Sequence, residues 1–85
     1  MSDLSLFNVL QDVSDERIRQ INKWGPQHHD DPTWMLILGE EVGEVAKSII
    51  DRIHSGKTDI AETRKELVQV AAVAVAWLEC LDNKK

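Results

Sequence analysis

Residues 66–79 read ELVQVAAVAVAWLE, and this stretch decides the fold. Its valines are interleaved with alanine, the strongest helix former, and do not alternate with polar residues as in a half-buried strand. A helix that is apolar nearly all round is buried on more than one side. We therefore predict a helix from Thr58 or Asp59 to Leu81, with part of its surface covered by a second copy of the chain.

Two earlier stretches, residues 4–22 and 34–54, also carry apolar residues at helical spacing. The polar residues 14–16 interrupt the first stretch, which leaves open one continuous helix or a helix broken near Val13. We predict an all-α fold, a small antiparallel bundle of three main helices in a single domain over residues 1–85. Because a domain of this length buries a limited core, we expect oligomerisation to complete the bundle.

The loop between the first two helices covers residues 25–33 and contains both prolines. The Gly-Pro pair at its start ends the first helix, and Asp31 or Thr33 is placed to cap the second. The glycine within residues 55–57 ends the second helix.

The composition excludes several classes of protein. With 42% hydrophobic residues, the 85-residue chain has the content of a folded domain. Fifteen acidic and ten basic residues give a net charge of -5, which argues against binding to a nucleic-acid backbone. Cys80 is the only cysteine, the N-terminus lacks a signal-peptide pattern, and no apolar stretch reaches the ~20 residues that span a bilayer. We therefore expect a cytoplasmic protein that binds neither nucleic acid nor a membrane.

An acidic cluster in the second helix consists of Glu40, Glu41 and Glu44, and Glu66 with Gln69 repeats its spacing in the third. Residues three or four apart share a helix face. Apolar residues flank both clusters, so we expect the acids at a helix–helix seam, where buried charges are paired or coordinate a metal. Converging oxygens without a nearby base favour a hard divalent cation, Mg²⁺ with Mn²⁺ as a substitute. The alternative is a solvated acidic face.

The order Glu40-Glu41-x-x-Glu44 and then Glu66-x-x-Gln69 resembles the signature of the MazG-like, all-α nucleoside triphosphate pyrophosphohydrolases. In that signature two acidic motifs lie on two antiparallel helices. Gln69 stands where the family pattern has an aspartate.

A second segment adds to the resemblance. Residues 17–29, RIRQINKWGPQHH, are similar to the arginine-rich helix and Lys-Trp-Gly segment of short, single-domain members, which often come from phages and mobile elements. Residues 66–79 are similar to the same subgroup, so the resemblance covers roughly residues 15–82.

The resemblance implies Mg²⁺-dependent hydrolysis of a (d)NTP to the (d)NMP and pyrophosphate, by a homodimer or homotetramer that maintains the nucleotide pool. It implies metal ligation by Glu41, Glu44, Glu66 and Gln69. Because a neutral amide is a poorer magnesium ligand, Gln69 is a ligand, a partner of a ligand or a polar interface residue. Glu40 is a further ligand or, like Glu41, a catalytic group that accepts a proton from the attacking water.

Four residues around the first loop are predicted to bind the substrate: Lys23, Trp24, Gln27 and His29. Trp24 would stack on the base, since aromatic rings stack on any nucleobase. His29 would contact a phosphate or the base, and Lys23 would steer the triphosphate. The sequence does not indicate which base is preferred.

Two other functions compete with the enzyme. The first is a non-catalytic, oligomeric interaction module in which the acids only keep the chain soluble. The second is a di-iron carboxylate bundle, which needs Glu-x-x-His pairs. No such pair occurs, because Lys47 follows Glu44 by three places and Gln69 follows Glu66.

Overall fold

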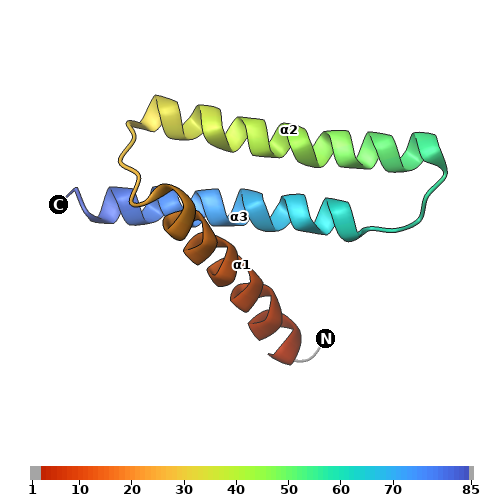
Figure 1. The fold of residues 1–85 in the computed structure, drawn as a ribbon, viewed down its shortest axis with the longest axis horizontal. Coiled ribbons are helices and arrows are strands. Elements are labelled where there is room, and N and C mark those ends of the chain that lie inside the picture. The colour runs from red at the N-terminus through yellow and green to blue at the C-terminus, as the bar shows by residue number, and fades with distance from the viewer. Residues whose placement is uncertain (1–2, 85) are drawn as a thin grey trace.

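A computed structural model describes residues 3–84 as three helices, α1 (Asp3–Trp24), α2 (Asp31–Ser55) and α3 (Ala61–Asp82). No strand occurs among these residues, which confirms the predicted all-α class. Helices α2 and α3 form an antiparallel hairpin, and α1 crosses α3 obliquely (Figure 1). Helix α1 packs against α3 and not against α2, so α3 is the helix that both others share. This accounts for the burial of Ala72, Val73 and Ala76, whereas Leu67 and Leu78 of the same stretch remain 51% and 60% exposed.

Helix α1 is continuous, so the break considered near Val13 does not occur. The prediction for the start of α2 was wrong, because α2 begins at Asp31 rather than at Trp34. Its cap is Asp30, whose Oδ1 accepts a hydrogen bond from the Thr33 backbone N–H at 2.9 Å. Neither Asp31 nor Thr33 is the cap.

The connection between α2 and α3 is longer than predicted. Gly56 ends α2 with φ of 68°, the left-handed conformation that glycine adopts without a steric penalty. Asp59 then accepts a hydrogen bond from the Ala61 backbone N–H at 2.9 Å, and α3 starts at Ala61 instead of Thr58 or Asp59.

The core is small and centres on Trp34, whose side chain is 2% exposed. Trp34 packs with Val73, Ala76 and Cys80 of α3. Trp77 lies against this cluster, and its Nε1 donates a hydrogen bond to Asp31 Oδ1 at 2.9 Å. The first turn of α2 is therefore tied to α3 by both apolar packing and a polar bond.

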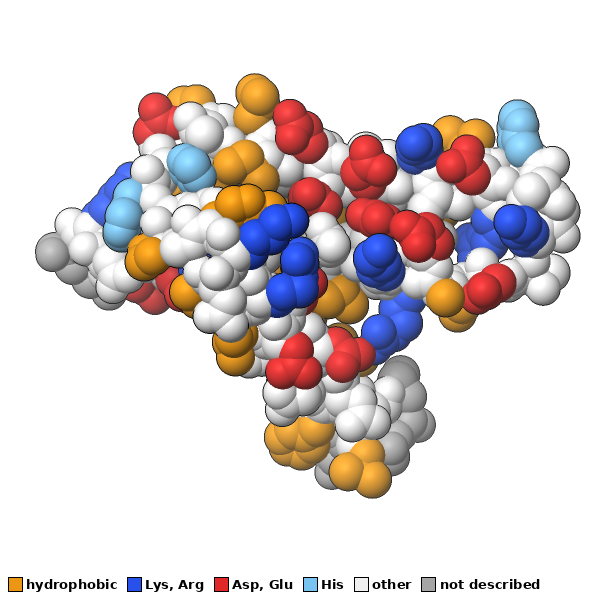
Figure 2. Space-filling model, in the orientation of Figure 1, with side chains coloured by type: hydrophobic (Ala, Val, Ile, Leu, Met, Phe, Trp, Pro, Cys, Tyr) orange, Lys and Arg blue, Asp and Glu red, His pale blue; other side chains and the backbone are white. Residues whose placement is uncertain are grey.

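The first turns of α1 have no packing partner among the described residues. Their large apolar side chains are 44–70% exposed: Leu4, Leu6, Phe7, Val9 and Leu10. Figure 2 shows apolar side chains at this free end of α1 and acidic side chains gathered over the middle of the α2–α3 hairpin. None of the helices described within residues 3–84 is long and apolar enough to cross a membrane.

Trp34 and Trp24 are expected to contribute very differently to the free energy of unfolding. Replacement Trp34→Ala is expected to lower the free energy of unfolding by about 3–5 kcal/mol, because it leaves a cavity beneath α3. Trp24, which is 54% exposed, serves as the control, and Trp24→Ala should cost about 1 kcal/mol or less. Chemical denaturation measures both, and an equal loss in the two variants would contradict this description of the core.

Candidate active site

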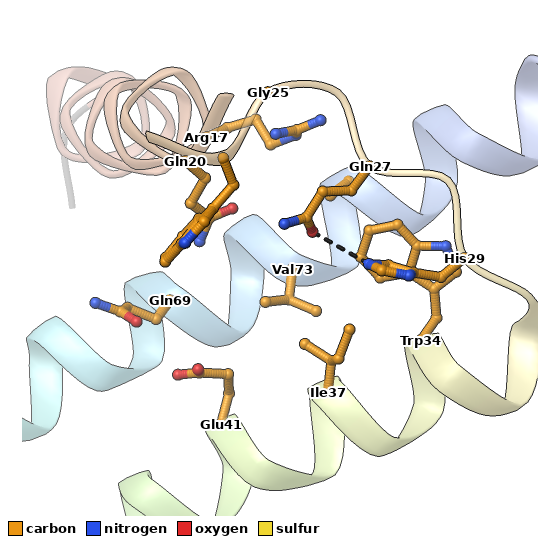
Figure 3. Close-up of a pocket in the computed structure, with 12 residues that line it drawn as sticks. Arg17, Gln20, Gly25, Gln27, His29, Trp34, Ile37, Glu41, Gln69 and Val73 are labelled. Atoms are coloured by element: carbon orange, nitrogen blue, oxygen red, sulfur yellow. Dashed lines mark hydrogen bonds between the residues drawn. The ribbon is translucent and has the colours of Figure 1, made fainter. Parts of the chain in front are cut away.

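A cavity of about 200 Å³ lies between the end of α1, the loop of residues 25–30 and the facing sides of α2 and α3 (Figure 3). Its apolar wall comes from Trp34 and Ile37 of α2 and from Val73 of α3. All three helices and the first loop therefore meet around a single hollow that combines polar and apolar side chains.

Helix α1 contributes Arg17, Gln20 and Trp24 to the wall. Helical spacing places these three residues on one face, since they are three and four positions apart. Arg17 Nε also donates to Glu79 Oε1 of α3 at 3.0 Å, which holds this end of α1 against the hairpin. Arg17 and Gln20 were not predicted as site residues, although their spacing from Trp24 was a usable signal.

The loop contributes Gln27 and His29, which contact each other. Gln27 Oε1 lies 3.3 Å from His29 Nε2. The His29 ring meets the Trp34 ring edge to face, with 4.8 Å between centroids and 78° between planes. The loop side of the cavity therefore packs against the core through the contact between His29 and Trp34.

Three of the four residues predicted to bind substrate thus meet in one cavity: Trp24, Gln27 and His29. Lys23 does not belong to the wall. Its ammonium lies 4.7 Å from the centroid of the Trp24 ring, where it makes a cation–π contact.

The predicted metal ligands are divided between two adjacent places. Glu41 of α2 and Gln69 of α3 belong to the cavity and reach toward the same end of it (Figure 3). Glu44 and Glu66 instead line a neighbouring hollow of about 90 Å³ between the same helices. Glu40 is exposed and lines neither hollow.

The carboxylates repel one another across the hairpin. Burial raises the pKa of Glu41, and the charges of Glu66 and Glu44 raise it further. Burial also raises the pKa of Glu66, as do its neighbours Glu62 and Glu44, while Lys65 opposes them. The negative charge at this seam is therefore only partly compensated by the chain itself.

Two acids beyond the predicted set belong to this environment. Glu16 of α1 contributes to the raised pKa of Glu41, and Glu62 contributes to that of Glu66. Glu62 lies one helical turn before Glu66, so its spacing was a signal. Nothing local marks Glu16, because its position depends on how α1 crosses α3.

The chemistry of the donors fits a hard divalent cation, because carboxylate groups on two facing helices share a seam whose negative charge is only partly compensated. As the side chains lie, however, residues 3–84 contain no group of three or more His, Cys, Asp or Glu side chains close enough to hold one ion. Glu41 and Glu44 are on α2 and Glu66 is on α3, and they line two neighbouring hollows, so these side chains would have to move closer together to bind a shared ion.

Comparisons with protein-family models, curated proteins and solved structures find no match to this chain. The assignment of this site therefore depends on the motif residues and on the geometry around them.

The raised pKa of Glu41 predicts a pH-dependent effect on stability. An unfolded glutamate titrates near 4.5, so the folded state binds protons more tightly and loses stability as pH rises through the raised pKa of Glu41. Glu41→Gln removes this loss, and its melting temperature should exceed that of the wild type at pH 7 without divalent metal. The gain should disappear below pH 4.5.

Glu40→Gln is the matched control, since Glu40 is exposed on the same helix. Thermal melts between acidic and neutral pH measure both variants. A gain for Glu41→Gln that persists at acidic pH, or an equal gain for Glu40→Gln, would show that charge repulsion at Glu41 is not the cause.

Proposed function

We propose that this chain is a MazG-like nucleoside triphosphate pyrophosphohydrolase, which uses Mg²⁺ to hydrolyse a (d)NTP to the (d)NMP and pyrophosphate. One observation carries the proposal. Glu41 of the acidic motif belongs to the wall of the same cavity as Trp24, Gln27 and His29 of the Lys-Trp-Gly segment. Two motifs that are separate in sequence thus share a hollow in which a nucleotide would contact both.

In this proposal the two ends of the cavity have different tasks. Trp24, which lines the cavity and is 54% exposed, would stack on the base. Glu41 faces the phosphate end, with Gln69 beside it. The substrate would therefore lie with its triphosphate directed toward the acidic seam of α2 and α3.

The acids at the seam would hold the cation through Glu41, Glu44 and Glu66. When bound, Mg²⁺ neutralises phosphate charge, orients the triphosphate and lowers the pKa of a bound water. Glu40 is exposed and free to accept a proton from the attacking water. Gln69 keeps its three alternatives, as a ligand, a partner of a ligand or a polar contact.

The proposal includes a homodimer or homotetramer. The radius of gyration is 14.5 Å, whereas a compact domain of this length has about 12 Å. The accessible surface is 6312 Å², roughly 1,200 Å² more than the ~5,100 Å² of a compact monomer of this mass. This excess is larger than the ~800 Å² that a standard interface buries on each partner, and the exposed apolar end of α1 provides part of it.

The same exposed end favours the second candidate, a non-catalytic interaction module that binds through α1. The only cysteine, Cys80, is a free and buried thiol, which agrees with the cytoplasmic setting expected for either function.

The function is tested by pyrophosphate release from canonical and modified dNTPs, with Mg²⁺ and with chelator. We expect Mg²⁺-dependent formation of monophosphate and pyrophosphate. Glu41→Gln and Glu44→Gln should each lower kcat by about 100-fold or more, because metal-assisted charge stabilisation amounts to several kcal/mol and each 1.36 kcal/mol is tenfold. Asp82→Asn, at the end of α3, should leave kcat unchanged.

Three other results would contradict parts of the proposal. Release of single phosphates would reject the pyrophosphohydrolase. Full activity in both glutamate variants would reject the metal-site assignment. Absence of turnover on every triphosphate would favour the interaction module.

The assembly is tested by light scattering at micromolar concentration, where we expect a dimer or tetramer. Phe7→Lys places a charge in the exposed apolar end of α1 and should shift the mass toward the monomer. Asn8→Lys adds the same charge at the next, exposed position and should have a smaller effect. A monomeric wild type would defeat this part of the proposal.

A further inference from the structure

The amide of Gln27 has a defined orientation in the cavity wall. Its oxygen, Oε1, lies 3.3 Å from His29 Nε2. An amide oxygen only accepts hydrogen bonds, so His29 Nε2 carries the hydrogen and donates it. The amide nitrogen is at the opposite side of the group and turns into the cavity (Figure 3).

His29 itself is fixed by the core. Its ring meets the edge of Trp34, which is only 2% exposed, with 4.8 Å between ring centroids. The His29 ring is therefore braced on one side by Trp34 and bonded on the other to Gln27. This arrangement leaves His29 Nε2 engaged within the protein.

Gln20 presents the complementary group from α1. Its Nε2 donates one of its two N–H groups to Glu16 Oε2 at 3.2 Å, which orients the amide and leaves its oxygen able to accept a hydrogen bond. Gln20 and Gln27 line the cavity together with the apolar side chains of Ile37 and Val73. The hollow therefore offers one oriented donor and one acceptor beside an apolar wall.

From this geometry we infer that His29 is a positioning residue that holds the Gln27 amide as a hydrogen-bond donor to the nucleobase, with Gln20 as the acceptor. The inference rests on the proposed function and names how its cavity recognises a base. Every common base carries donor and acceptor atoms on its edges and has apolar faces, which match these walls. His29 thus acts through Gln27 and makes no contact with phosphate.

This role separates His29 from a phosphate ligand. A deoxynucleoside carries no phosphate, so loss of a phosphate ligand would leave its affinity unchanged, whereas loss of a residue that positions the Gln27 amide would weaken its binding.

The first experiment measures binding of deoxynucleosides, which lack phosphate, by titration calorimetry to the full chain. We expect His29→Ala to weaken binding by about 3- to 10-fold, the value of one hydrogen bond. His29→Gln retains an N–H donor of similar reach and should restore affinity to within about twofold of the wild type. Gln27→Glu replaces the inward donor with an acceptor and should weaken binding at least as much as His29→Ala.

Gln11→Glu is the matched control for the added charge. Gln11 is a glutamine on α1 whose Nε2 donates to Asp15 Oδ1 at 2.8 Å. It does not belong to the cavity wall. It should bind deoxynucleosides as the wild type does. Because Gln27 is only partly buried, its substitution is expected to leave the fold intact, which circular dichroism checks.

The second experiment measures kcat and KM for a dNTP from acidic to neutral pH. His29→Ala should raise KM with kcat within about twofold of the wild type. A fall in kcat that His29→Gln does not restore, or unchanged deoxynucleoside binding in His29→Ala and Gln27→Glu, would overturn the inference. Deoxynucleoside binding with the expected variant pattern but no turnover would support the inference and reject the proposed hydrolase.

Discussion

The packing of one side chain, Trp34, against α3 supports most of what surrounds the cavity. Trp34 begins the core with Val73, Ala76 and Cys80, and it braces the ring of His29. The hairpin, the loop and the apolar wall therefore depend on a single buried indole. A core this small has little redundancy, because few other buried side chains are available to replace its contacts.

The acidic seam opposes this stabilisation. Glu41 and Glu66 have raised pKa values because they are partly buried beside other carboxylates. Their ionised forms therefore repel one another where α2 and α3 pack together. A cation that binds the folded state would remove this repulsion and stabilise the fold by mass action. In the proposed enzyme, the same charges that weaken the hairpin would attract the metal.

The sequence predicted the elements better than their ends. Part of the apolar pattern of residues 66–79 follows from the packing of α3 against both other helices, although Leu67 and Leu78 remain exposed. The start of α2 was predicted wrongly, because Asp30, Asp31 and Thr33 are all competent caps and only the three-dimensional loop selects Asp30. The start of α3 was also wrong, since the Asp59 side chain forms a local bond that delays the helix until Ala61.

The same limit applies to the candidate site. Motif spacing identified Trp24, Gln27, His29, Glu41 and Gln69, which share one cavity. It did not reveal that Glu44 lines a different hollow, because a residue three positions on is both rotated and displaced along the axis. Arg17 and Gln20 could have been inferred from their spacing to Trp24 on one face of α1. Glu16 comes into this environment only through the crossing of α1 over α3, which local periodicity does not encode.

Helix α1 is held against α3 along its second half only. From Asp12 onward it is clamped to α3 by ion pairs, Asp12 with Arg64 at 2.7 Å and Arg17 with Glu79 at 3.0 Å. The preceding residues 3–11 extend beyond the clamp by about 13 Å. Because α1 is a single continuous helix, its apolar tip and the cavity wall formed by Arg17, Gln20 and Trp24 belong to the same element. A partner bound at the tip would therefore contact the helix that also lines the cavity.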